Sequence, residues 1–143
     1  MAERMLILLA VAGLTVLLLV AGRAFVAARR QRALVAVPYI SDGAASEAGR
    51  VRLLAFSTLQ CQQCRLLQKP ALEEVAAQDA SVEIVSVDAL SSPELAARYQ
   101  IFTVPSTVVL APDGRAAAVN YGYAPAQQLL EQIKAADRAL AAR

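Results

Sequence analysis

The chain has 143 residues, of which 57% are hydrophobic, and its formal net charge is only +2. Such a small charge gives no indication of a nucleic-acid-binding surface. The chain has no histidine and therefore lacks the usual acid–base group near neutral pH and the commonest metal ligand. Its two cysteines are too few for the disulfide framework of a small secreted protein, so they indicate a functional site.

The first predicted element is an uncharged apolar stretch over residues 5–22. As a helix these residues span roughly 27 Å, close to the hydrocarbon thickness of a bilayer. A cleaved signal peptide is the alternative, but its apolar core is usually only ~7–15 residues long and precedes a small-residue cleavage site. We therefore interpret residues 1–32 as a retained single-pass membrane anchor with a basic flank.

The arginines around this stretch are unevenly distributed. Only Arg4 precedes it, whereas four arginines follow it within a dozen residues, namely Arg23, Arg29, Arg30 and Arg32. The positive-inside rule then predicts that the C-terminal domain faces the cytosol, at a membrane of the bacterial plasma-membrane type. The alternative is an exported domain whose arginines lie at the lipid headgroups.

Residues 33–50 are predicted to link the anchor to a globular domain over residues 51–143. Within the linker, Ala33–Val37 could form a short edge strand before Pro38, since proline is tolerated at strand ends and edges. The small and polar residues of Ser41–Gly49 are typical of a loop.

The domain alternates apolar runs with helical patterns. The predicted strands are Val51–Phe56, Val82–Val87 (a buried strand), Thr107–Leu110 and Ala116–Tyr121, the last two joined by a turn at Pro112-Asp113-Gly114. The predicted helices are Cys61–Gln78, Pro93–Tyr99 and Ala124–Leu140. The first has Leu66, Leu67, Leu72, Val75 and Ala76 on its inner side, and the second is capped by Ser91 or Ser92. The third has Leu129, Leu130, Ile133 and Leu140 facing inward. This order predicts an α/β fold with one mixed sheet and helices on both faces.

Cys61 and Cys64 follow the first strand of the domain and open a helix. Unpaired backbone N–H groups and the positive end of the helix dipole favour a thiolate there, so the pKa of Cys61 should fall below ~8.5. We expect Arg65 to strengthen this field, and Gln62 and Gln63 to tune the pair. Cys64, one turn deeper, should stay protonated and resolve the mixed disulfide that Cys61 forms with a substrate.

Metal sites are the alternative interpretation of this pair. A closed zinc site needs four ligands, and the chain has no histidine and no third cysteine. Haem attachment needs a histidine where Arg65 stands. Delivery of a soft ion such as Cu(I) is a further alternative, weakened because no methionine or histidine lies near the pair. We therefore predict no metal, and no cofactor beyond a redox-active Cys61–Cys64 disulfide.

The chain resembles the thioredoxin family in the order and spacing of its motifs over residues 51–139. The matching segments are Phe56–Cys64, Asp88, Tyr99–Ser106, Pro112-Asp113-Gly114 and Tyr121-Gly122. The resemblance implies that Pro105 is a cis-proline packed against the cysteines and that Val104 offers backbone hydrogen bonds to an extended substrate. It also implies that Gly122 lies beside the substrate groove. The alternatives are that Pro105 is an ordinary proline at the start of a strand and that Gly122 is a plain turn glycine.

The sequence departs from the family's pattern at several positions. Gln60 stands in place of the family's tryptophan, and Gln62 and Gln63 in place of its Gly-Pro pair. The family's buried acid, which is thought to relay a proton to the resolving step, falls on Ala55. Pro70 lies one residue late in the helix, which suggests an altered kink.

These features predict a membrane-anchored thiol–disulfide oxidoreductase that exchanges electrons with protein disulfides, as a reductant rather than an oxidant. Its expected partners are protein disulfide clients, an upstream electron donor and the membrane contacted by residues 5–22. The alternative from another class is a binding module that holds a client peptide in the groove by Pro105 without turnover, which Ala55 makes plausible.

Overall fold

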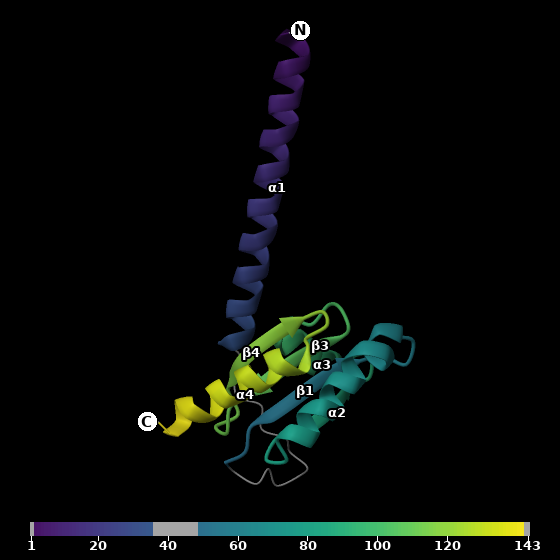
Figure 1. Ribbon diagram of the computed structural model, residues 1–143, viewed down its shortest axis with the longest axis vertical. Helices are drawn as coiled ribbons and strands as arrows, with labels where there is room; N and C mark the ends of the chain where they lie inside the picture. The colour runs from purple at the N-terminus through teal and green to yellow at the C-terminus, as the bar shows by residue number, and fades with distance from the viewer. Residues whose placement is uncertain (1, 36–48, 142–143) are drawn as a thin grey trace. The chain divides into compact units, whose positions relative to one another are not determined.

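The computed structural model describes residues 2–35 and 49–141, and it divides into two compact units at residues 1–31 and 32–143. Most of the first unit is helix α1, which runs from Ala2 to Leu34 (Figure 1). Within Glu3–Leu34, the most apolar 18-residue window of this helix has a mean hydropathy of 2.8, and none of that window is buried. Helix α1 is therefore long and apolar enough to span a membrane.

The end of helix α1 differs from the prediction. The expected edge strand over Ala33–Val37 is wrong at Ala33 and Leu34, which are the last two residues of the helix, while positions 36 and 37 lie outside the described residues. Alanine and leucine are strong helix formers, and extending an existing helix gains a hydrogen bond without a partner strand. Ala33 is fully buried in a core of the second unit.

The second unit is built on one mixed four-stranded sheet in the order β2-β1-β3-β4. Its strands are β1 (Arg52–Ser57), β2 (Glu83–Asp88), β3 (Ser106–Leu110) and β4 (Ala116–Tyr121). β1 pairs with β2 in parallel and with β3 antiparallel, and β3 and β4 form an antiparallel hairpin. The crossover helices between β1 and β3 and the turn at residues 112–114 account for this order.

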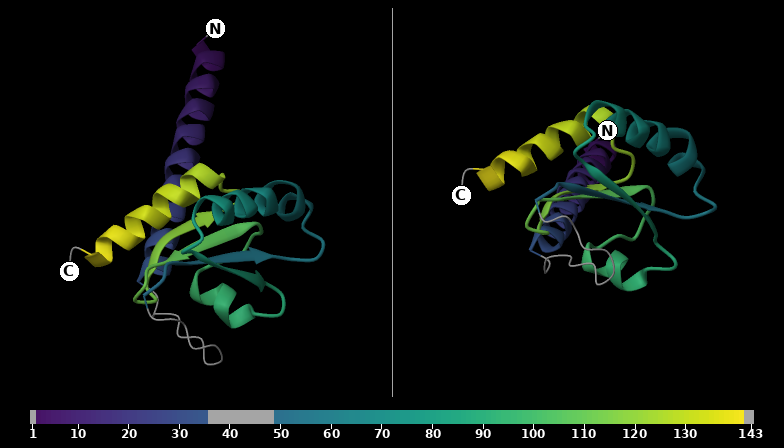
Figure 2. Two further views of the ribbon diagram at one scale, coloured as in Figure 1. Left: turned by 60° about the horizontal axis from the view of Figure 1, so that its bottom comes forward. Right: turned by 90° about the horizontal axis from the view of Figure 1, so that it is seen from below.

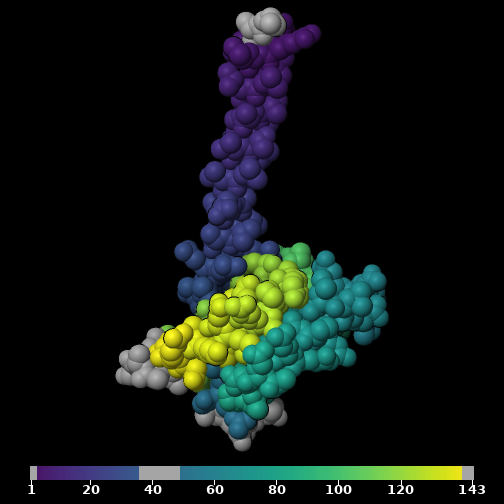
Figure 3. Space-filling model, viewed as in Figure 1, coloured from purple at the N-terminus to yellow at the C-terminus, as the bar shows by residue number. Residues whose placement is uncertain are grey.

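Helices cover both faces of the sheet (Figure 2). On one face lie α2 (Lys69–Gln78) and α4 (Ala126–Ala141), which contact each other and lie side by side in Figure 3. Their core includes Leu53, Val75, Val109, Leu129 and Ile133. On the other face lies α3 (Pro93–Arg98), above a core that includes Leu54, Phe56, Tyr99 and Val108. The predicted fold class is therefore confirmed.

Two predictions about burial are wrong. The strand predicted over Val82–Val87 was expected to be buried. It corresponds to β2, an edge strand whose residues are mostly exposed or half-buried, because only β1 pairs with it. Leu66, Leu67 and Ala76 are exposed, and the buried positions of this helix are instead Cys64, Gln68, Ala71 and Val75. A helix that packs on one side buries only a stripe at intervals of three and four residues.

Candidate active site

The cysteine pair lies where β1 passes into the helix that follows it. Residues 62–63 are α-helical, the next five form a π-helical segment, η1 (Cys64–Gln68), and α2 continues from Lys69. The Lys69 N–H donates to the Cys64 carbonyl, five residues back, instead of four. A π-helical turn holds one extra residue. The extra residue accommodates Pro70, which cannot donate a backbone hydrogen bond and lies one residue later than the corresponding proline in the family pattern.

Cys61 and Cys64 form a disulfide with Cα atoms 5.3 Å apart. The backbone N–H of Cys64 donates to the Cys61 sulfur at 3.1 Å, and the Cys61 carbonyl accepts from the Arg65 N–H at 3.4 Å. Cys61 therefore lies at the start of the helix, where the first backbone N–H groups have no partner within the helix. It is half-buried, whereas Cys64 is only 7% exposed.

Most segments named by the resemblance lie at the same end of the sheet as the cysteines. The exception is the Pro112-Asp113-Gly114 turn, which lies at the opposite end because Leu110, just before it, pairs with Arg52 at the start of β1. Phe56, near the end of β1, pairs with Ser106, which in turn pairs with Tyr121 at the end of β4. The residues directly before Ser106 and after Tyr121 are Pro105 and Gly122. The Gly122 N–H donates to the Pro105 carbonyl at 2.9 Å, which joins these two loops.

Each loop residue has a distinct conformation. The Val104–Pro105 peptide bond is cis, the isomer that the resemblance implies, and Val104 is half-buried. Gly122 has φ +91°, where a side chain is strained, and a Cβ at this position would meet no atom within 4 Å. The space beside Gly122 is therefore open. The predicted tuning residues Gln62, Gln63 and Arg65 are all exposed.

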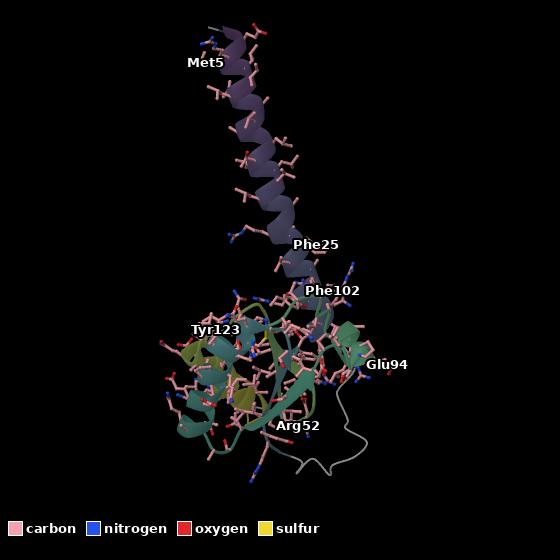
Figure 4. The ribbon with its side chains drawn as sticks, turned by 90° about the vertical axis from the view of Figure 1, so that its right-hand side faces the viewer. Met5, Phe25, Arg52, Glu94, Phe102 and Tyr123 are labelled. Atoms are coloured by element: carbon pink, nitrogen blue, oxygen red, sulfur yellow. A yellow bond between two sulfur atoms is a disulfide. The ribbon has the colours of Figure 1, made fainter. Side chains whose placement is uncertain are left out.

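Exposed apolar side chains flank these loops. Leu59 precedes Cys61, Phe102 precedes Pro105, and Tyr123 follows Gly122. Figure 4 shows Phe102 and Tyr123 at the end of the domain away from Arg52, which starts β1. Sequence reasoning did not single out these three residues, because a single apolar residue in a loop belongs to no periodic pattern that would mark it as exposed.

Buried polar side chains lie on the α2–α4 face of the sheet. Ala55 pairs with Thr107, and Thr107 pairs with Asn120, so the three form a row across β1, β3 and β4. The Asn120 side chain donates to Thr107 Oγ1 at 3.0 Å and to Gln132 Oε1 at 2.8 Å, and accepts from Gln128 at 2.8 Å and from Gln132 at 2.9 Å. Ala55 itself is 6% exposed. Uncharged groups thus occupy the region where the family has a buried acid.

Gln68 is another site-forming residue that sequence reasoning missed. It is 3% exposed, and its carboxamide donates to the Ala124 carbonyl at 3.1 Å and accepts from the Ala124 N–H at 3.0 Å. The available signal was a polar residue four positions after Cys64, on the side of the helix that Val75 buries. Among the residues that the structure describes, no cluster of three or more histidine, cysteine or acidic side chains could hold a metal ion.

Comparison with known proteins agrees with this geometry. A family model described as thioredoxin-like domain matches residues 42–137, and the chain belongs to this family. Thioredoxin of Staphylococcus aureus is 30% identical over 84 residues, which cover 58% of this chain and 79% of that protein. The fold together with the Cys61–Cys64 disulfide makes the protein a thiol–disulfide oxidoreductase in general terms.

Solved thioredoxin structures share the fold. A variant thioredoxin from Halobacterium salinarum superposes with a TM-score of 0.56 at 25% identity and covers 62% of this chain and 76% of its own. Thioredoxin of Fasciola hepatica has a TM-score of 0.53 at 29% identity and covers 61% of this chain and 81% of its own. The family match starts at residue 42 and therefore does not include helix α1.

Proposed function

We propose that the protein is a membrane-anchored dithiol reductant of protein disulfides. Cys61 attacks a client disulfide, one client sulfur leaves as a thiolate, and a Cys61–client mixed disulfide forms. Cys64 then attacks Cys61, which releases the second client sulfur and leaves the Cys61–Cys64 disulfide. Two electrons pass from the dithiol to the client, and an upstream electron donor reduces the pair again.

The hydrogen bond from the Cys64 N–H to the Cys61 sulfur, 3.1 Å long, carries this assignment. In the dithiol form the same N–H would stabilise a thiolate on Cys61, which is also the more exposed sulfur-bearing residue. Cys64 is nearly buried, so a client reaches it only through Cys61. Gln62 and Gln63 lie between the cysteines without a cationic side chain that would favour an oxidant, which supports the reducing direction.

Trapping experiments test these roles in the full-length protein in detergent micelles. The wild type should reduce insulin with dithiothreitol as electron donor. Cys61→Ser should abolish this activity, while Cys64→Ser should accumulate mixed disulfides on Cys61, identified by mass spectrometry. Adducts on Cys64 in the Cys61→Ser variant would reverse the assignment.

The second candidate function is a binding module that holds a client peptide beside Pro105 without turnover. Ala55 favours it, because no buried acid stands there to assist the resolving step. A folded wild-type protein that binds client peptides but reduces no insulin would favour this candidate.

We propose further that the domain faces the cytosol, on the evidence of four arginines after the apolar stretch and one before it. Cellular reductants would then keep the cysteine pair reduced. The test is labelling of intact cells with a membrane-impermeant maleimide, before and after permeabilisation. Labelling of Cys61 in intact cells would place the domain outside and require an electron source in the membrane.

A further inference from the structure

The side chain of Gln68 joins two distant parts of the active site. Gln68 belongs to η1 and lies four residues after Cys64, and both residues are buried. Its carboxamide makes two hydrogen bonds to the backbone of Ala124, a residue 56 positions further along the chain. Ala124 is fully buried, so removal of the Gln68 side chain takes away the partners of a buried N–H and a buried carbonyl.

The segment that Gln68 holds is the loop after β4. Ala124 follows Gly122 by two residues, and the Gly122 N–H donates to the Pro105 carbonyl. Hydrogen bonds to backbone atoms therefore link the turn that carries Cys64, the loop of Gly122 and the loop of Pro105. The open space beside Gly122 borders this linkage.

We propose that Gln68 is a positioning residue, which fixes the Gly122–Ala124 segment relative to the cysteine turn and so sets the groove for an extended protein client. This inference rests on the proposed function as a reductant of protein disulfides. A protein client needs both the groove and the sulfurs, whereas a small disulfide needs only access to Cys61. Loss of Gln68 should therefore affect the two substrates differently.

The test compares the Gln68→Ala variant with the wild type, both full-length in detergent micelles. We expect kcat/KM for insulin to fall about tenfold, mainly through KM, as the loss of two buried hydrogen bonds implies. The rate with 5,5′-dithiobis(2-nitrobenzoic acid), a small disulfide, should stay unchanged. Gln132→Ala is the matched control: it also removes a carboxamide bonded at both ends, to Asn120, and both rates should stay at the wild-type value.

A conservative variant separates positioning from general damage to the fold. In Gln68→Glu the neutral carboxyl can both donate to and accept from Ala124, whereas the ionised carboxylate can only accept. Burial raises the pKa of the introduced carboxyl. The insulin rate of this variant, divided by the wild-type rate at each pH, should therefore recover as the pH falls through that raised pKa.

Hydrogen exchange provides a readout that needs no activity. Exchange of the segment around Ala124, measured by mass spectrometry, should become faster in Gln68→Ala and stay unchanged in Gln132→Ala. Unchanged exchange in Gln68→Ala overturns the inference, whatever the activity of the wild type. An equal loss of rate with insulin and with the small disulfide also overturns it, whereas a wild type that reduces no insulin refutes the proposed function alone.

Discussion

Replacing Ala55 with aspartate restores an acid at the position where the thioredoxin family carries one. Ala55 lies in β1 between Leu54 and Phe56, which face the α3 core, so its side chain points to the opposite face, covered by α2 and α4. The cysteine turn leads into α2 on this same face. The introduced carboxyl would therefore lie on the side of the sheet where Cys64 must lose its proton.

The cost of this substitution follows from the packing around Ala55. The residue is 6% exposed and pairs with the fully buried Thr107. The added atoms should cost about 1–3 kcal/mol of stability through overpacking. Burial raises the pKa of the new carboxyl above that of an unfolded chain. As the pH rises between these two values the unfolded state loses its proton first, so the destabilisation should grow with pH across that interval.

The assay separates the two chemical steps. Reduced protein reacts with 5,5′-dithiobis(2-nitrobenzoic acid), which releases one thionitrobenzoate when Cys61 attacks and a second when Cys64 resolves the mixed disulfide. In Ala55→Asp the second phase should accelerate, on the order of 10²-fold for a positioned acid–base group. Ala55→Asn is the matched control, with similar size and no proton to transfer. An unchanged second phase in a folded Ala55→Asp variant would refute proton relay at this position.

Three further predictions concern stability and pH. Asn120→Ala removes four hydrogen bonds, including the one to Thr107, and should cost about 4 kcal/mol at ~1 kcal/mol per bond. Urea unfolding followed by tyrosine fluorescence measures this, since residues 1–31 contain no tyrosine. Gln100 has φ +58°, and its exposed side chain donates to the Ala97 carbonyl at 3.0 Å. Relief of ~1–2 kcal/mol of backbone strain outweighs the ~0.5 kcal/mol of this exposed bond, so Gln100→Gly should raise stability by about 1 kcal/mol in the same assay, and an unchanged midpoint would contradict this. The Ser91 hydroxyl, followed by the Leu90 N–H, lowers the pKa of Asp88, so Ser91→Ala should raise that pKa toward 3.8 in an NMR titration. A lowered pKa stabilises the fold at pH values above the unfolded-state pKa. The wild type should therefore lose this contribution as the pH falls through the folded-state pKa of Asp88, and Ser91→Ala should lose its smaller contribution at a higher pH.

The fold could be predicted from local patterns, but burial within each element could not. Apolar runs and turn residues located all four strands, because a strand and its turns are marked by neighbouring residues. Whether a strand is central or at an edge depends on its partners, and so β2 was wrongly expected to be buried. Leu66 and Leu67 were misplaced because an apolar side chain beside a functional turn looks the same in sequence as one in the core.

The cysteine pair was predictable because its chemistry depends on a fixed spacing at a helix start. The cis bond before Pro105 was implied only by the family, since most bonds before proline are trans. The role of Gln68 was not predictable, because its partner Ala124 lies 56 residues away and is contacted through backbone atoms. A side chain that binds backbone leaves no complementary residue type in the sequence.

The polar groups on the α2–α4 face suggest how this site differs from one with a buried acid. Within the described part of the chain, the fully or nearly buried polar side chains of that face are Gln68, Thr107 and Asn120, and none of them ionises. Satisfied carboxamides carry no charge to desolvate, so they stabilise the fold without a pH-dependent cost. A buried acid would add its own proton to the equilibrium between dithiol and disulfide. Near neutral pH, the pH dependence of that equilibrium should therefore follow the two cysteines alone, and a slope that breaks at a third ionisation would contradict this.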